Sequence, residues 1–257
     1  MSCMIIARWA HPLFLVCLLL PAALLAQDVN VLLAKARQAE KAFQEKEALQ
    51  AYLQVLQQEP RHLAALCRTS ELYNILGERQ GAKDKQKEYY RSAEQYARQA
   101  LQADPNSAEA NFVMAAAMGR RALIESGEEK IKAVKDIREY ALKAIKLDPN
   151  SYKGYHVLGK WHYEVSDLSA LERWLVKVAF KALPPASLEE AISHFERSKQ
   201  LNPHFLLNYY ELARCRERNK EAAKAISLLE AMLQLPNASA GDASLKDKAR
   251  SLLKSLQ

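Results

Sequence analysis

Apolar and small residues recur at helical spacing along most of this chain, and proline closes each stretch. Alanine, leucine and tyrosine return every three or four residues, which is the period of one face of an α-helix. A proline follows the last apolar turn of five segments, at a position where a helix cannot continue: Pro60, Pro105, Pro149, Pro203 and Pro236. The pattern predicts an all-helical protein built from a repeated unit.

The spacing of these prolines identifies the repeat. Successive prolines are 45, 44, 54 and 33 residues apart. A tetratricopeptide repeat has a period of about 34 residues, so the last interval fits it and the others fit with insertions of about 10 to 20 residues. Four second helices place small, aliphatic or aromatic residues at the same offsets before proline: Ala48, Tyr52 and Val55; Ala93, Ala97 and Ala100; Ile137, Ala141 and Ala144; Ala191, Phe195 and Ser198. Small residues of the first helices allow close helix packing: Ala36, Ser70, Ala115, Gly159 and Ala213.

The predicted fold is therefore a right-handed α-solenoid of about five tetratricopeptide-like helix pairs over residues 27–257. A final helix caps the exposed end of the stack, as solenoids require, and one extra helix is inserted in the fourth repeat. Serines after turns supply the N-caps of several helices, with a capping box at Ser187 and Glu190. The predicted helices are 29–43 with 45–59, 61–77 with 84–103, 107–124 with 128–147, 150–164 with 187–201, 204–218 with 220–234, the inserted helix 168–182 and the cap 242–256.

The N-terminus has a different composition. Residues 1–26 contain one arginine, Arg8, followed by the apolar run Leu13–Leu20 and a small-residue end at Ala26. This order is typical of a secretory signal peptide, and its core is shorter than the roughly 20 residues of a membrane span. We expect cleavage after Ala26, an exported periplasmic or extracellular protein, and no stable membrane span after cleavage; retention as an anchor is the alternative.

Composition and charge narrow the function classes. Glycine and proline number only 7 and 9 among 257 residues, which disfavours turn-rich β-folds. The net charge is +7, but 37 basic residues are interspersed with 30 acidic ones. Nucleic-acid binding needs a concentrated basic stripe, so no nucleic-acid partner is expected.

The sequence carries no recognisable catalytic or metal-binding motif. His156 and His162 lie six residues apart and point to different helix faces. The leader takes two of the four cysteines, which leaves Cys67 and Cys215 in distant repeats and predicts no disulfide between them. We expect no enzyme activity, no cofactor and no metal site.

Two surfaces remain as candidates for binding. The first is the concave face of the solenoid, which is formed by the first helices and is basic and aromatic in the last two repeats: Lys153, His156, Lys160, Tyr163, Tyr210 and Arg214. Such a groove suits a protein or peptide partner with an acidic segment or a carboxylate terminus. The second is the inserted helix 168–182, whose Trp174 and Phe180 form one wall of a site for a lipid or another apolar ligand, or touch a membrane.

The stretch from Leu158 to Val165, with Leu168, Pro184-Pro185 and Glu189-Glu190-Ala191, resembles the regulator of microtubule dynamics family. The resemblance extends from about Arg61 to Pro236. It implies the helical repeat fold and a non-enzymatic role in interactions. The leader indicates an exported, bacterial-type member, where microtubules are absent, so the family's name does not carry over as a function. We therefore expect a binding scaffold that recognises a protein or peptide through its concave face.

Overall fold

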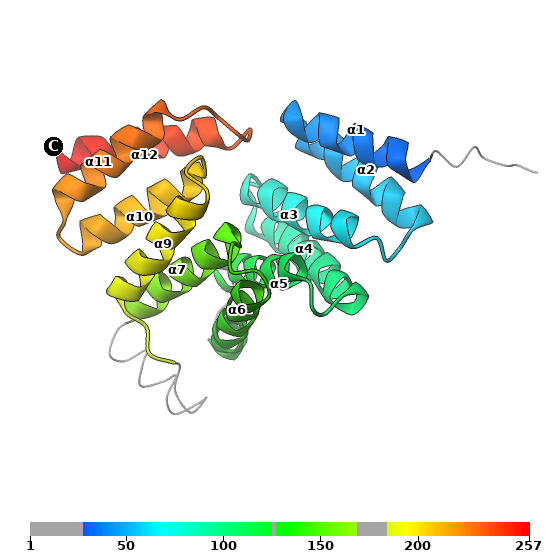
Figure 1. Ribbon diagram of the computed structural model, residues 1–257, viewed down its shortest axis with the longest axis horizontal. Helices are drawn as coiled ribbons and strands as arrows, with labels where there is room; N and C mark the ends of the chain where they lie inside the picture. The colour runs from blue at the N-terminus through cyan, green and yellow to red at the C-terminus, as the bar shows by residue number, and fades with distance from the viewer. Residues whose placement is uncertain (1–27, 125–126, 169–183) are drawn as a thin grey trace, which may run out of the picture.

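The computed structural model describes residues 28–124, 127–168 and 184–257. Every regular element in these ranges is an α-helix, as Figure 1 shows. The helices are α1 (Val29–Lys41), α2 (Glu45–Gln58), α3 (Leu63–Glu78), α4 (Lys83–Ala103), α5 (Ala108–Ala122), α6 (Gly127–Leu147), α7 (Tyr152–Ser166), α9 (Leu188–Leu201), α10 (Leu206–Arg218), α11 (Ala222–Gln234) and α12 (Asp242–Leu256). None of the described helices has both the length and the apolar content that crossing a membrane requires.

The predicted helical solenoid is confirmed. The heaviest packing joins α1 to α2, α3 to α4, α5 to α6, α7 to α9 and α10 to α11, which are the five pairs that the sequence indicates. The last helix, α12, packs on α11 and α10 and covers the end of the stack. Two predicted segments lie outside the described residues: the leader 1–26 and nearly all of the inserted helix 168–182.

Serine side chains begin three of the helices at the predicted positions. Ser107, Ser151 and Ser187 each accept a hydrogen bond from the backbone amide three residues later, at 3.1–3.2 Å. Each bond satisfies one of the amides that a helix N-terminus leaves without a partner, which is worth about 1 kcal/mol. His62 caps α3 in the same way through Nδ1, which accepts from the Ala65 amide at 3.1 Å.

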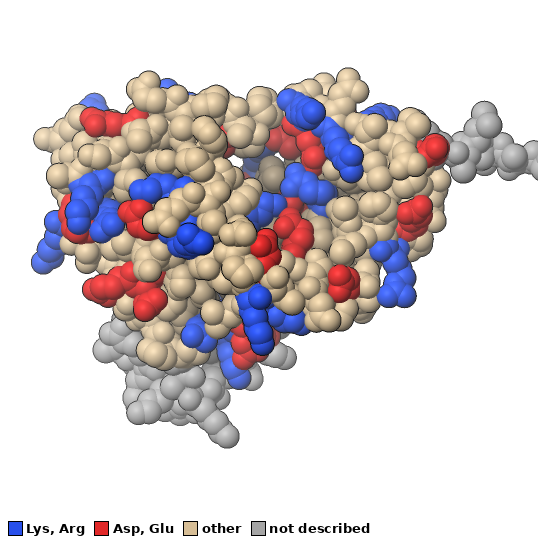
Figure 2. Space-filling model, in the orientation of Figure 1, with Lys and Arg blue, Asp and Glu red and all other residues tan. Residues whose placement is uncertain are grey.

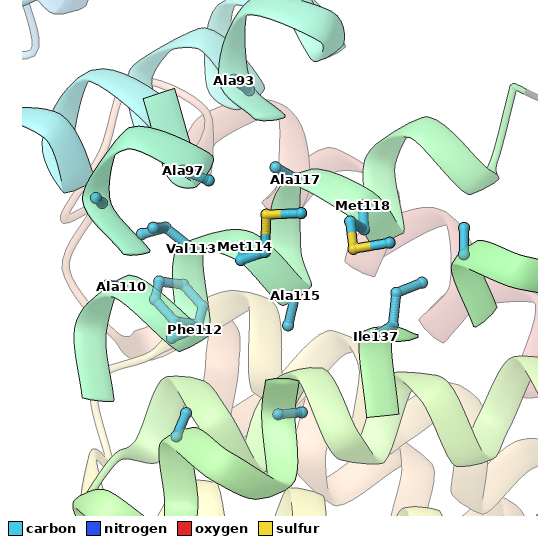
Figure 3. Packing of buried hydrophobic residues seen from close by; sticks show 14 of the residues in the cluster. Ala93, Ala97, Ala110, Phe112, Val113, Met114, Ala115, Ala117, Met118 and Ile137 are labelled. Atoms are coloured by element: carbon cyan, nitrogen blue, oxygen red, sulfur yellow. The ribbon is translucent and has the colours of Figure 1, made fainter. Parts of the chain in front are cut away.

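The core is built from small residues where helices cross and larger ones between them. Figure 3 shows Ala93 and Ala97 of α4 above Val113 and Met114 of α5. The small residues predicted for the first helices, Ala36, Ser70, Ala115 and Ala213, are fully buried. Because these side chains are short, neighbouring helix backbones approach closely and the repeat geometry is kept along the stack.

Gly159 and Phe195 form the closest of these contacts in the fourth repeat. A Cβ atom built on Gly159 would lie 3.0–3.1 Å from three ring atoms of Phe195. Phe195 is completely buried. Glycine at this position therefore lets α7 pack closely against α9, and the contact confirms the predicted pairing of the two segments.

The solenoid curves until its last loop reaches its first repeats. Glu45 at the start of α2 pairs with Arg79 just after α3, at 3.0 Å. The backbone amide of Ala240, which precedes α12, also hydrogen-bonds to Glu45. Figure 1 shows this loop beside the α1–α3 end, and Figure 2 shows a hollow in the centre of the same face, with acidic and basic side chains around it.

Candidate binding surface

The first helices of successive repeats contact one another along the inside of the curve, in the order α3, α5, α7, α10. We call their charged side the inner face; it carries Arg68, Glu71, Glu109, Lys153, Lys160, Glu211, Arg214 and Arg218. Ion pairs join Lys153 and Lys160 of α7 to carboxylates of α3, α5 and α10. Further pairs lie within α3 and within α10. The inner face therefore carries paired charges of both signs, whereas the sequence predicted a basic and aromatic groove.

Lys153 of α7 joins three first helices. Its Nζ lies 2.7 Å from Glu71 of α3 and 3.0 Å from Glu109 of α5. The same ammonium group is 4.9 Å from the centre of the Phe112 ring, within cation–π distance. Burial disfavours the charged lysine, but the two carboxylates outweigh burial and raise the pKa of Lys153. Lys153 is thus held inside the protein's own network.

Glu71 is the shared acceptor at this end of the network. Arg68 contacts both Glu71 and Glu40 of α1, the latter at 2.6 Å. Burial by itself favours the protonated acid, but the positive charges of Lys153 and Arg68 outweigh it and lower the pKa of Glu71. The carboxylate therefore stays ionised. Through Arg68 and Lys153 it is connected to Glu40 of α1 and Glu109 of α5, so the network includes helices of the first four repeats.

A second cluster lies where α7 faces α10. Lys160 and Arg214 both reach Oε2 of Glu211, at 3.0 and 3.1 Å. Lys160 also pairs with Glu164, at 2.9 Å. Burial raises the pKa of Glu211, whereas the two cations lower it more strongly, so the net shift is downward. Lys160 and Arg214, which the sequence assigned to an acidic partner, thus converge on the chain's own Glu211.

Three cations surround the ring of Tyr163. Lys160, Arg214 and Arg218 lie 5.4, 5.0 and 4.8 Å from its centre. Arg218 also donates to the backbone carbonyl of Tyr163 at 2.9 Å, which fixes α10 against the end of α7. We call Tyr163, Lys160, Glu211, Arg214 and Arg218 the Tyr163 cluster. Lys160, Arg214 and Arg218 keep 29%, 34% and 25% of their side chains exposed, so a partner can still reach them.

His156 lies inside the protein, although the sequence placed it on the binding surface. Its Nδ1 is 3.0 Å from Oδ1 of Asn208, whose amide nitrogen donates to the carbonyl of Phe195 at 2.8 Å. Since Oδ1 can only accept, Nδ1 of His156 carries the proton. Burial lowers the pKa of His156 to about 4, so the imidazole is neutral at pH 7. The helical spacing was right, but at this level α10 covers the face of α7.

The remaining predicted site residues are Tyr210, Trp174 and Phe180. Tyr210 is half-buried on α10 and packs against the C-terminal core. Trp174 and Phe180 lie outside the described residues, so the apolar-ligand alternative stays a prediction. Sequence reasoning missed Glu71, Glu109 and Glu211. The available signal was their position on first helices, at the same level as the lysines.

The sequence profile of the family described as "Regulator of microtubule dynamics protein 1-3" matches residues 32–257. The chain belongs to the regulator of microtubule dynamics family. It is 29% identical to regulator of microtubule dynamics protein 1 of Caenorhabditis elegans over 49% of this chain and 56% of that protein. It is also 29% identical to protein 3 of Rattus norvegicus over 67% of this chain and 37% of that protein. The chain thus spans about half or less of these relatives.

Solved structures with the same fold are tetratricopeptide repeat proteins. A thermophilic one from Thermus thermophilus has a TM-score of 0.66 at 12% identity and covers 88% of this chain and 99% of that chain. One from Parabacteroides merdae has a TM-score of 0.60 at 15% identity and covers 89% of this chain and 71% of that chain. Because these identities are low, the likeness to the two solved structures concerns the fold alone.

Proposed function

We propose that this protein is a non-enzymatic scaffold that binds a protein or peptide segment on its inner face, at the Tyr163 cluster. The observation that carries the proposal is the grouping of three partly exposed cations around one tyrosine ring, from two helices of neighbouring repeats. The fold and the family support an interaction role.

The cluster is arranged for recognition because its side chains are already ordered. Glu211 holds Lys160 and Arg214 in place, so binding does not have to immobilise two long side chains. Ordering such a side chain costs about 0.5–1.5 kcal/mol on association. The guanidinium group of Arg214 has five N–H donors and spends few of them on Glu211. The remaining donors suit a carboxylate or backbone carbonyl of a peptide.

The paired charges change the partner that we propose. A strongly acidic segment would compete with Glu71, Glu109 and Glu211 for the same cations. A segment with a single carboxylate, such as a chain terminus, needs only the spare donors of Arg214. We therefore propose a carboxylate-bearing peptide of mixed charge as the partner.

The test compares two arginines that differ in position. Arg214→Gln removes the charge but leaves Lys160 to neutralise Glu211, so the fold should persist. Arg197→Gln is the matched control, because Arg197 is exposed on the second helix α9, away from the inner face. Affinity capture from the native host should recover the same partner with wild-type protein and Arg197→Gln, and lose it with Arg214→Gln. Equal capture by Arg214→Gln at unchanged helicity would refute the proposal.

We also propose that the protein is exported, on the basis of the sequence of residues 1–26. N-terminal sequencing of the protein from its native host should begin at Gln27. An N-terminus at Met1 in the membrane fraction would instead support an anchor.

A further inference from the structure

We propose that His162, Glu190 and His194 form a binding site for a zinc ion or a similar late transition metal, outside the inner face. One ligand atom of each residue lies within 4.8 Å of those of the other two. His162 comes from α7, while Glu190 and His194 come from α9. The site is independent of the Tyr163 cluster and of the proposed peptide.

The positions on the two helices account for the grouping. Glu190 and His194 are four residues apart, which places both side chains on one face of α9. The close packing at Gly159 brings α7 against this face, and the imidazole rings of His162 and His194 come within 5.3 Å of each other, centre to centre. Capping by Ser187, which accepts from the amide of Glu190, fixes the first turn of α9.

The separations approach those of a metal site. Two ligand atoms at about 2.0–2.1 Å from a tetrahedral zinc ion lie about 3.4 Å from each other. Nε2 of His194 is 3.6 Å from Oε2 of Glu190. The Glu190 side chain is 59% exposed and has room to rotate toward the rings. Small movements of these side chains therefore bring the ligand atoms to the separations of a zinc site.

The two histidines have the chemistry of ligands. His162 is 5% exposed, and its buried Nδ1 has no hydrogen-bond partner. A buried polar atom without a partner costs free energy unless an ion or water satisfies it. Histidine binds a metal ion through an unprotonated ring nitrogen, and the unpartnered Nδ1 of His162 offers such an atom.

The ligand set and the surroundings indicate the kind of metal. Two imidazoles and one carboxylate suit zinc and its neighbours, whereas Mg²⁺ and Ca²⁺ take mainly oxygen ligands. Three protein ligands leave one position open. His162, Glu190 and His194 line a pocket of about 370 Å³, together with Leu142, Leu158 and Arg138. The charge of Arg138 opposes a bare cation and favours an anionic fourth ligand.

The experiment is a zinc titration of protein purified from its native host without an affinity tag, after removal of metals by a chelator. Calorimetry should show one Zn²⁺ per chain and no saturable Mg²⁺ binding. His194→Ala should weaken zinc binding by more than about 100-fold, since even an outer hydrogen-bond partner of a ligand is worth about 10- to 100-fold. Glu190→Gln should weaken it as well. His204→Ala is the matched control, because His204 is exposed between α9 and α10 and should leave the affinity unchanged.

Three results would overturn the site. They are the absence of one-to-one zinc binding by the wild-type protein, equal affinity in His194→Ala, and weakened binding in His204→Ala. Circular dichroism checks that the variants are folded. If His194→Ala unfolds, the exposed Glu190→Gln decides alone, and wild-type affinity in that variant counts against the proposal.

Discussion

A leucine at position 159 should destabilise the fourth repeat, and the structure gives the size of the effect. The first added atom, Cβ, would already lie 3.0–3.1 Å from the ring of Phe195. This ring cannot move outward, because Phe195 is fully buried and lies 5.4 Å from the His156 ring. Three further carbon atoms then have to enter a filled space. Overpacking of this kind costs about 1–3 kcal/mol, and full burial places Gly159→Leu near the upper end.

A second effect has the opposite sign. Replacing a glycine inside a helix stabilises the helix by up to about 1 kcal/mol. The net loss for Gly159→Leu is therefore about 2 kcal/mol. For a protein of this size, each kcal/mol lowers the melting temperature by about 2–4 °C, so the expected decrease is about 4–8 °C.

Gly119 provides the matched control. It lies inside α5, and a Cβ atom built there would meet nothing within 4 Å. Gly119→Leu should keep the gain in helix propensity without the steric cost, so the two leucine variants should differ by about 3 kcal/mol. Urea unfolding followed by circular dichroism measures both. Equal midpoints for the two variants would refute the assignment of Gly159 as the residue that allows α7 and α9 to meet.

Two further predictions concern buried titratable groups. The pKa of His156 is about 4 in the folded protein against 6.5 as its ordinary value, so its contribution to stability is complete above pH 6.5 and is lost as the pH falls toward 4. The free energy of unfolding should be about 2 kcal/mol lower at pH 5 than at pH 7. In His156→Gln this difference should be smaller. Urea midpoints of the wild-type protein that do not change between the two pH values would contradict the prediction. Cys67 and Cys215 are free and buried, with thiol pKa values raised to about 12 by burial. Neither should react with a thiol reagent until urea unfolds the protein, and a Cys67–Cys215 link in a non-reducing peptide map would contradict the fold.

The helices and their pairing follow from the sequence because they depend on local patterns. Proline cannot continue a helix beyond its first turn, and a small residue at a fixed offset marks where two helices cross. Ser107, Ser151 and Ser187 cap helices through bonds that span three residues. The pairing of the two helices that carry Gly159 and Phe195 could be predicted from the repeat alone. These interactions form within one helix or between two paired helices. At that range the spacing of residues along the sequence determines where their side chains lie.

The chemistry of the inner face depends on the curvature of the whole stack. Lys153 reaches Glu71, 82 residues away, across a complete repeat. No spacing rule predicts that two helices from different repeats come close enough for this pair. The same holds for Glu211, which neutralises the cations that the sequence analysis assigned to a partner.

Burial was likewise decided by tertiary contacts. His156 and Lys160 share a stripe of α7, yet α10 covers the first and leaves the second partly open. His162 lies near Glu190 and His194 because helices α7 and α9 pack at Gly159, although the chain between them is long. A helical pattern defines which side chains share a face. Which of these faces meets a charge, a ring or solvent is set only when the repeats are stacked.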